Sequence, residues 1–221
     1  MIPPQANAEF VCAMEDVLDL YHEPYDPLRP VVCFDESNKQ LLAETRTPLP
    51  LQPGQRQRYD YEYERHGTCN LFMFFEPLAA WREVKVTDQR TMIDYAHCLK
   101  YLVDERYPQA EVIRVVQDNL NTHKPAALYE AFPPQEARRL WQRLEFHYTP
   151  KHRSWLNMAE IELSVLNGQC LDRRIGDKTT LSNEVTAWNI DRNQYATTVK
   201  WQFTTQDARI KLVRLYPSFN P

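Results

Sequence analysis

Hydrophobic positions in the first part of the chain recur at two different spacings. In residues 8–21, "AEFVCAMEDVLDLY", apolar side chains return every three or four positions, which predicts an amphipathic helix. Residues 31–37, "VVCFDES", form a short apolar run, and residues 67–86 form two aromatic-rich runs joined at "EPLAA". These runs predict a buried strand and a strand hairpin. Residues 45–65 between them are rich in Pro, Gln, Arg and Tyr and predict a long loop or arm.

The second part of the chain alternates between helical and strand patterns. Residues 88–107 have helical spacing with Thr87 or Asp88 as the N-cap, and residues 112–118 predict a strand. Two short helices follow at 125–132 and 134–144, then a strand at 145–150. A helix through residues 154–170 is expected to end with Gly168 as its C-cap, and two more helices follow.

This order of elements predicts the fold class. Three antiparallel strands followed by strands that alternate with helices are typical of an α/β fold. We expect a mixed sheet of three antiparallel and then two parallel strands, flanked by helices on both faces. A chain of 221 residues, 43% of them hydrophobic, is long enough for one substantial core.

Composition and charge narrow the class of protein. The formal net charge of −4 argues against binding nucleic acid by bulk charge, although residues 65–221 are mildly basic. The five cysteines are widely spaced and never form a CxxC pair, which favours a reducing compartment. The first residues, "MIPPQANAEF", have no signal-peptide pattern, and no apolar run is long enough to span a membrane. We therefore expect a soluble, cytoplasmic protein.

Carboxylates stand where the predicted strands end. Asp35 and Asp118 each close an apolar strand, and Glu160 lies near the start of a predicted helix. The carboxyl ends of strands are where open α/β sheets place their ligands. Three carboxylates brought together there would repel one another unless a cation lay between them, and oxygen-only ligands favour Mg²⁺ or Mn²⁺. The pattern predicts two such ions, arranged for displacement at phosphorus.

Three sequence blocks carry a resemblance to a known family. "VVCFDES", "RVVQDNLNTH" and "HYTPKHRSWLNMAE" resemble the signature blocks of the DDE transposases, specifically the mariner-like bacterial insertion-sequence family known as insertion sequence 630. The second block of that family has a D-N-x-x-x-H pattern, matched by Asp118, Asn119 and His123. The third has Asn three residues before Glu, matched by Asn157 and Glu160.

The resemblance implies a ribonuclease-H-like catalytic domain at residues 31–170, after an N-terminal helix and linker remnant at 1–30 and before a C-terminal helical extension at 171–221. It implies a DNA endonuclease and strand transferase that hydrolyses the phosphodiester at a transposon end and joins the freed 3′-hydroxyl to target DNA. Asp35 would bind both metal ions, Asp118 one and Glu160 the other. The implied partners are transposon-end and target DNA and further copies of the chain, in bacterial cytoplasm at the nucleoid.

Two departures from the family pattern leave alternatives open. Met158 stands where many members have Pro, and we expect the family's helix-turn-helix module for the transposon ends to be missing from this chain. A non-catalytic, truncated remnant that binds DNA or full-length transposase is therefore one alternative. A ribonuclease-H-like nuclease acting on hybrids or branched DNA is another.

Other residues are assigned supporting parts. We expect Asn119, His123 and Asn157 to support the active site, although Asn119 has the alternative of capping the helix near Pro125. The basic residues nearest the third block are candidates for phosphate contacts. They are Lys151, His152, Arg153, Arg173 and Arg174. Glu36 is expected to point away from Asp35, and Glu162 away from Glu160, so that both are structural.

Overall fold

A mixed five-stranded sheet forms the centre of the molecule. The computed structural model describes residues 7–46, 53–54, 61–150 and 154–217. Its strand order is β3-β2-β1-β4-β5. β1 is antiparallel to β2 and β2 to β3, whereas β4 is parallel to β1 and β5 to β4. The predicted fold class is confirmed. The strands are β1 (Val31–Glu44), β2 (Tyr63–Glu76), β3 (Trp81–Thr87), β4 (Ile113–Gln117) and β5 (Leu144–Tyr148).

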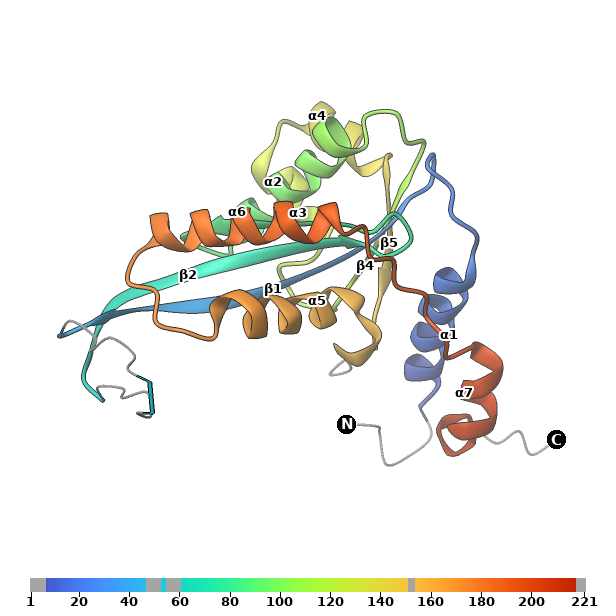
Figure 1. Ribbon diagram of the computed structural model, residues 1–221. Coiled ribbons are helices and arrows are strands. Elements are labelled where there is room, and N and C mark those ends of the chain that lie inside the picture. The colour runs from blue at the N-terminus through green and yellow to red at the C-terminus, as the bar shows by residue number, and fades with distance from the viewer. Residues whose placement is uncertain (1–6, 47–52, 55–60, 151–153, 218–221) are drawn as a thin grey trace.

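Helices cover both faces of the sheet, and Figure 1 shows α2 and α4 above it and α5 below. Because side chains alternate along a strand, β1 sends Cys33 into one hydrophobic cluster and Phe34 into the other. The Cys33 cluster includes α1 (Ala8–His22), α5 (Met158–Leu166), α6 (Lys178–Gln194) and α7 (Thr205–Lys211). The Phe34 cluster includes α2 (Met92–Tyr101), α3 (Ala126–Ala131) and α4 (Pro134–Trp141).

Short helical turns extend several of these helices. α2 continues as a π-type turn, Leu102–Arg106, and α5 is preceded by a 3₁₀ turn at Ser154–Leu156 and continued by a π-type turn at Asn167–Leu171. A 3₁₀ turn at Val213–Leu215 follows α7. The predicted C-cap at Gly168 is wrong, because the backbone there continues in a helical turn and Gly168 does not have positive φ.

Two other boundaries differ from the sequence prediction. α2 begins later than expected, because Thr91 caps it. The Thr91 hydroxyl accepts a bond from the Asp94 backbone N–H at 3.2 Å, and the Asp94 carboxylate accepts one from the Thr91 backbone N–H at 2.8 Å. β1 runs to Glu44 instead of ending near residue 37, and pairs with β2 as far as Tyr63. β3 pairs with β2 only from Asn70 onward, so the rest is a two-stranded ribbon that projects from the sheet.

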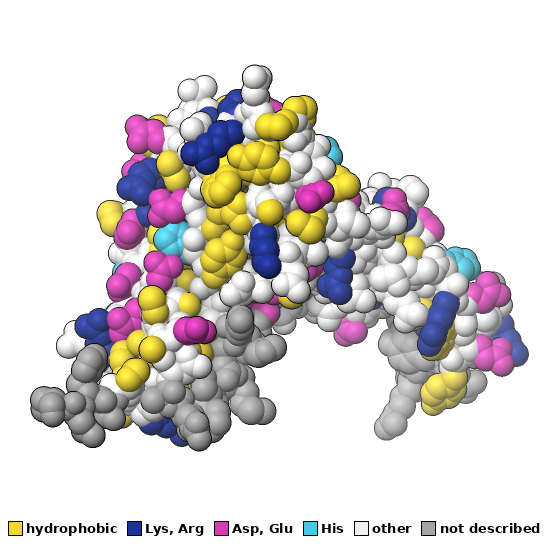
Figure 2. Space-filling model, turned by 180° about the vertical axis from the view of Figure 1, so that it is seen from behind, with side chains coloured by type: hydrophobic (Ala, Val, Ile, Leu, Met, Phe, Trp, Pro, Cys, Tyr) yellow, Lys and Arg dark blue, Asp and Glu magenta, His cyan; other side chains and the backbone are white. Residues whose placement is uncertain are grey.

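The two ends of the described chain pack against each other. The Asn7 backbone N–H donates to the Leu215 carbonyl at 2.9 Å, and the Arg209 guanidinium binds Glu15 through two bonds of 2.8 Å. Figure 2 shows the molecule from behind, where hydrophobic side chains gather over the thick body and the ribbon end carries mostly polar and charged ones. None of the helices in the described ranges is long and apolar enough to cross a membrane.

Candidate active site

Asp35 lies on β1, on the face of the sheet that α5 covers. Its side chain is 7% exposed, and its Oδ1 accepts a bond from the Glu36 backbone N–H at 2.8 Å. Its Oδ2 accepts a bond of 3.2 Å from the Asn157 side-chain amide. Both carboxylate oxygens are therefore fixed by donors, which orients the group without neutralising it.

Asp118 follows β4 directly and is level with Asp35. The parallel register pairs Cys33 with Val116, so two residues further along, Asp35 and Asp118 stand side by side on neighbouring strands. Neighbouring strands lie about 4.8 Å apart, which brings the two carboxylates to one edge of the sheet. β4 ends here because the Asp118 Oδ1 accepts the Leu120 backbone N–H at 3.3 Å, which starts a turn.

His123 joins Asp118 to the other layer of the molecule. Its ring is 1% exposed, with Nδ1 at 2.5 Å from the Asp118 Oδ1 and Nε2 at 2.9 Å from the Glu36 Oε2. Burial alone lowers the pKa of His123, but the bonds to Asp118 and Glu36 outweigh it and raise the pKa to about 9. The imidazolium therefore neutralises part of the acidic charge at this edge.

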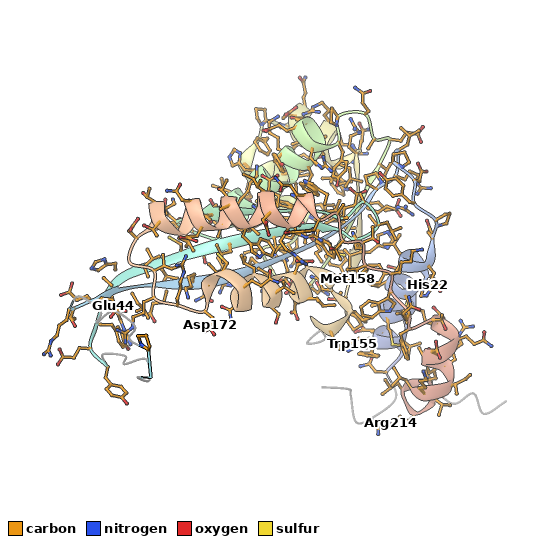
Figure 3. All side chains as sticks on the ribbon, in the orientation of Figure 1. His22, Glu44, Trp155, Met158, Asp172 and Arg214 are labelled. Atoms are coloured by element: carbon orange, nitrogen blue, oxygen red, sulfur yellow. The ribbon has the colours of Figure 1, made fainter. Side chains whose placement is uncertain are left out.

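Glu160 enters the same edge from α5. Asn157 is the N-cap of this helix: its Oδ1 accepts the Ala159 backbone N–H at 3.1 Å. The same side chain donates to the Phe34 carbonyl at 2.8 Å as well as to Asp35, so the start of α5 is attached directly to β1. Glu160 is half-buried in the first turn of the helix. Figure 3 shows Met158, the first residue of α5, near the junction with α1, and Asp172 towards the ribbon.

Electrostatics tie the three carboxylates together. Burial raises the pKa of Asp35 to about 8, and the negative charges of Glu160, Glu36 and Asp118 add to this rise, while the bond from the Glu36 N–H opposes it. A carboxylate that burial makes hard to ionise, and that neighbouring acids make harder still to ionise, is a place where a cation is favourable.

The donor set fits a hard divalent cation in its chemistry, since all three side chains offer carboxylate oxygens. Among the residues that the structure describes, no group of three His, Cys, Asp or Glu side chains stands ready to hold a metal ion. Asp118 instead bonds to His123. Holding an ion would therefore need side-chain movement at this edge.

The remaining predicted residues lie in several places. Asn119 is exposed beside Asp118. Lys151, His152 and Arg153 lie outside the described residues. Arg173 contacts Glu184 at 2.5 Å, and Arg174 contacts Glu44 at 2.6 Å. Glu44 is nine residues beyond Asp35 on β1, about 30 Å along the strand, so this pair does not join the carboxylates.

The contact between Glu36 and His123 is not predicted from the sequence. The expected alternation holds, since Glu36 faces the layer opposite to Asp35, but there it meets His123. Gln117 was also missed: it is fully buried, accepts a bond from the Tyr95 hydroxyl at 2.7 Å and donates to the His123 carbonyl at 3.1 Å. A polar residue inside the apolar run "VIRVVQD" was the available signal for it.

Solved structures with a similar fold are complexes of the Mos1 mariner transposase. They include the mariner Mos1 paired end complex with Mg, at a TM-score of 0.58 and 14% identity over 99% of this chain. A pre-cleavage Mos1 transpososome matches with a TM-score of 0.57 and 14% identity over 100% of this chain. The Mos1 mariner paired end complex with Mn matches with a TM-score of 0.55 and 15% identity over 86% of this chain. This chain spans 66%, 66% and 58% of those respective chains.

The search of curated proteins found no match. The family model described as DDE superfamily endonuclease matches residues 30–182, a stretch that contains Asp35, Asp118 and Glu160. Since that stretch is more than half of the sequence and its fold is the expected one, the chain belongs to the DDE superfamily of endonucleases.

Proposed function

We propose that the chain is the catalytic domain of a mariner-like DNA transposase of the insertion-sequence type. It would cleave DNA at transposon ends and transfer the freed strand into target DNA. The observation that carries the proposal is the β1–β4 register that sets Asp118 level with Asp35, with the charges of Glu160 and Asp118 acting on a buried Asp35. The Mos1 neighbours are described as paired-end and strand-transfer complexes, which supports transposon-end DNA and further copies of the chain as partners.

Each acidic residue has a distinct place in this proposal. Asp35, held in place by Asn157 and the Glu36 N–H, would contact both ions. Asp118 and Glu160 would each hold one ion. Mg²⁺ or Mn²⁺ bound there would polarise the scissile phosphate and favour deprotonation of the attacking water. Glu160 is half-buried and would also orient that water.

The supporting residues act through the carboxylates. His123 holds Asp118 in place, and Asn157 places α5 relative to β1. Arg173, which pairs with Glu184 of α6, and Arg174, which pairs with Glu44 at the end of β1, would contact DNA phosphates away from the reacting bond. Lys151, His152 and Arg153 remain candidates for phosphates near it.

The test is nicking of supercoiled plasmid in Mn²⁺ or Mg²⁺ by the chain and by Asp118→Asn, which keeps the shape of the side chain and removes its charge. Glu111→Gln is the matched control, because Glu111 is exposed and lies just before β4, at the end opposite Asp118. We expect metal-dependent nicking by the wild type and the control, and none by Asp118→Asn.

Other outcomes separate the alternatives. Equal nicking by Asp118→Asn would refute the assignment of Asp118. Preferential cutting of an RNA–DNA hybrid over duplex DNA would favour the ribonuclease-H-like nuclease. Metal binding without nicking of any substrate would favour a non-catalytic remnant.

A further inference from the structure

A buried ionic network lies behind α5, on the side away from the carboxylates. Arg82 on β3 is 0% exposed, and its Nη2 is 3.2 Å from the Glu162 Oε1. Arg192 on α6 donates through Nη2 to the same carboxylate, at 3.0 Å from Oε1 and 3.3 Å from Oε2. Glu162 is 3% exposed. One buried carboxylate on α5 is therefore shared by two guanidinium groups from two other elements.

Arg82 is fixed from several directions. Its Nη1 donates to the carbonyls of Ala80 at 3.2 Å and Arg192 at 3.1 Å, and its Nη2 donates to the Thr197 carbonyl at 3.2 Å. Its guanidinium lies over the Phe75 ring, 5.0 Å from the centroid. The position of Arg82 is thus set independently of Glu162. The Glu162 carboxylate therefore has to adopt the position that the fixed Arg82 guanidinium defines.

α6 is attached to β3 at the same point. The Asn193 side chain accepts the Arg82 backbone N–H at 2.9 Å and donates to the Arg82 carbonyl at 2.8 Å, as a neighbouring strand would. Leu181, Val185 and Trp188 of α6 join the hydrophobic cluster that contains α5. Arg192 and Asn193 lie beyond residue 182, where the match to the family model ends.

The geometry of α5 links this network to Glu160. Residues two apart on an α-helix are separated by about 200° around the axis, so Glu162 and Glu160 point to nearly opposite sides. Asn157 attaches only the start of the helix to β1. A helix held at one end can still turn about its axis, and a second attachment on the opposite side removes that freedom. Because ionic hydrogen bonds are directional, Glu162 sets the rotation more narrowly than apolar packing does.

We infer that Arg82, Glu162 and Arg192 form a positioning network that fixes the rotation of α5 and so the placement of Glu160 relative to Asp35. Through Arg192, α6 then helps to position a residue of the active centre. This rests on the proposed function, in which Glu160 is a metal ligand. The network touches neither metal nor DNA, so its members are positioning residues.

The test uses the full chain and measures Mn²⁺ affinity by the EPR signal of free Mn²⁺, beside plasmid nicking. Glu162→Gln keeps the size of the side chain and removes the charge that both arginines share. Partners that orient metal ligands typically change affinity by 10-fold or more, so we expect about a 10-fold weaker affinity for Mn²⁺. Circular dichroism and urea unfolding check that the variant is folded.

The matched control is Glu76→Gln. Glu76 is 2% exposed at the end of β2, accepts a bond from the Tyr107 hydroxyl at 2.6 Å and lies 3.9 Å from Arg106, and neither of these partners belongs to α5 or α6. We expect it to lower stability and leave Mn²⁺ affinity unchanged. Arg192, which is partly exposed, gives a second pair: Arg192→Lys keeps a positive charge and is expected to bind Mn²⁺ more tightly than Arg192→Met.

Folded Glu162→Gln with wild-type Mn²⁺ affinity would overturn the inference, as would equal affinities for Arg192→Lys and Arg192→Met. If the wild type binds Mn²⁺ but nicks no DNA, the proposed function fails, and the Mn²⁺ titrations still decide the inference. A wild-type chain that binds no Mn²⁺ would overturn both.

Discussion

Asn157 offers a quantitative test of how the active-site edge is held together. Its side chain is fully buried and makes three hydrogen bonds: it caps α5 through Ala159, and it donates to the Phe34 carbonyl and to Asp35. Asn157→Ala removes all three. Losing an N-cap costs about 1 kcal/mol, and each of the two buried bonds contributes about 1 kcal/mol more. We expect the free energy of unfolding to fall by roughly 3 kcal/mol.

The measurement is urea unfolding of the metal-free protein, with thermal unfolding beside it. For a chain of this length, each kcal/mol shifts the melting temperature by about 2–4 °C, so the expected drop is about 9 °C. Asn157→Ser keeps an oxygen that can cap the helix and loses the two donated bonds, so about 2 kcal/mol should be lost.

Asn7→Ala is the matched control. Asn7 caps α1 by accepting a bond of 2.9 Å from the Phe10 backbone N–H. Unlike Asn157, it donates no side-chain bond to β1 within the described residues. The control should therefore lose only about 1 kcal/mol. Equal losses for Asn7→Ala and Asn157→Ala would refute the argument that Asn157 attaches α5 to β1.

Three further predictions concern the same edge. In the folded chain the pKa of Asp35 is raised to about 8 and that of His123 to about 9, so the folded state holds more protons than the unfolded state. The free energy of unfolding of the metal-free chain should therefore fall as pH rises from about 6 to 9. A flat or rising profile in urea unfolding would contradict this. His123→Ala leaves the buried Glu36 carboxylate without its cationic partner, and adding Glu36→Gln removes that uncompensated charge. The double variant should therefore regain about 1 kcal/mol or more of the free energy of unfolding in urea. A further loss would contradict this. Mn²⁺ at about 100 times its dissociation constant should stabilise the chain by about 3 kcal/mol, and this gain should largely vanish in Asp118→Asn.

The parts of the site that the sequence predicts are those that local pattern determines. The apolar run that closes on Asp118 correctly marks the end of β4, whereas β1 continues past Asp35 to Glu44. Asn157 lies inside the helix predicted at 154–170, but it caps α5, which begins at Met158. Each signal lies within a few residues of the feature it predicts. The order of strands and helices then restricts the sheet to few topologies.

The parts that the sequence does not predict depend on contacts between distant residues. The second half of β1 lacks a clear alternating pattern, and it is a strand because residues 63–70 pair with it. Arg82 and Glu162 look like ordinary surface charges in the sequence, and they are buried because α6, far along the chain, covers them. Buried ion pairs of this kind have no local signature, since each charge is favourable inside only once its partner is in place.

The alternation of β1 explains why both layers of the molecule reach the edge where we propose the active site. Asp35 faces α5 and is held by Asn157, whereas Glu36 faces the opposite layer and contacts His123, which in turn holds Asp118. The two strand-borne carboxylates are therefore fixed from opposite sides of one sheet. Glu160 differs, because its place depends on how a helix packs. Changes in the C-terminal helices should accordingly affect the proposed active centre through Glu160, while changes in α2 and the turn after β4 should affect it through Asp118.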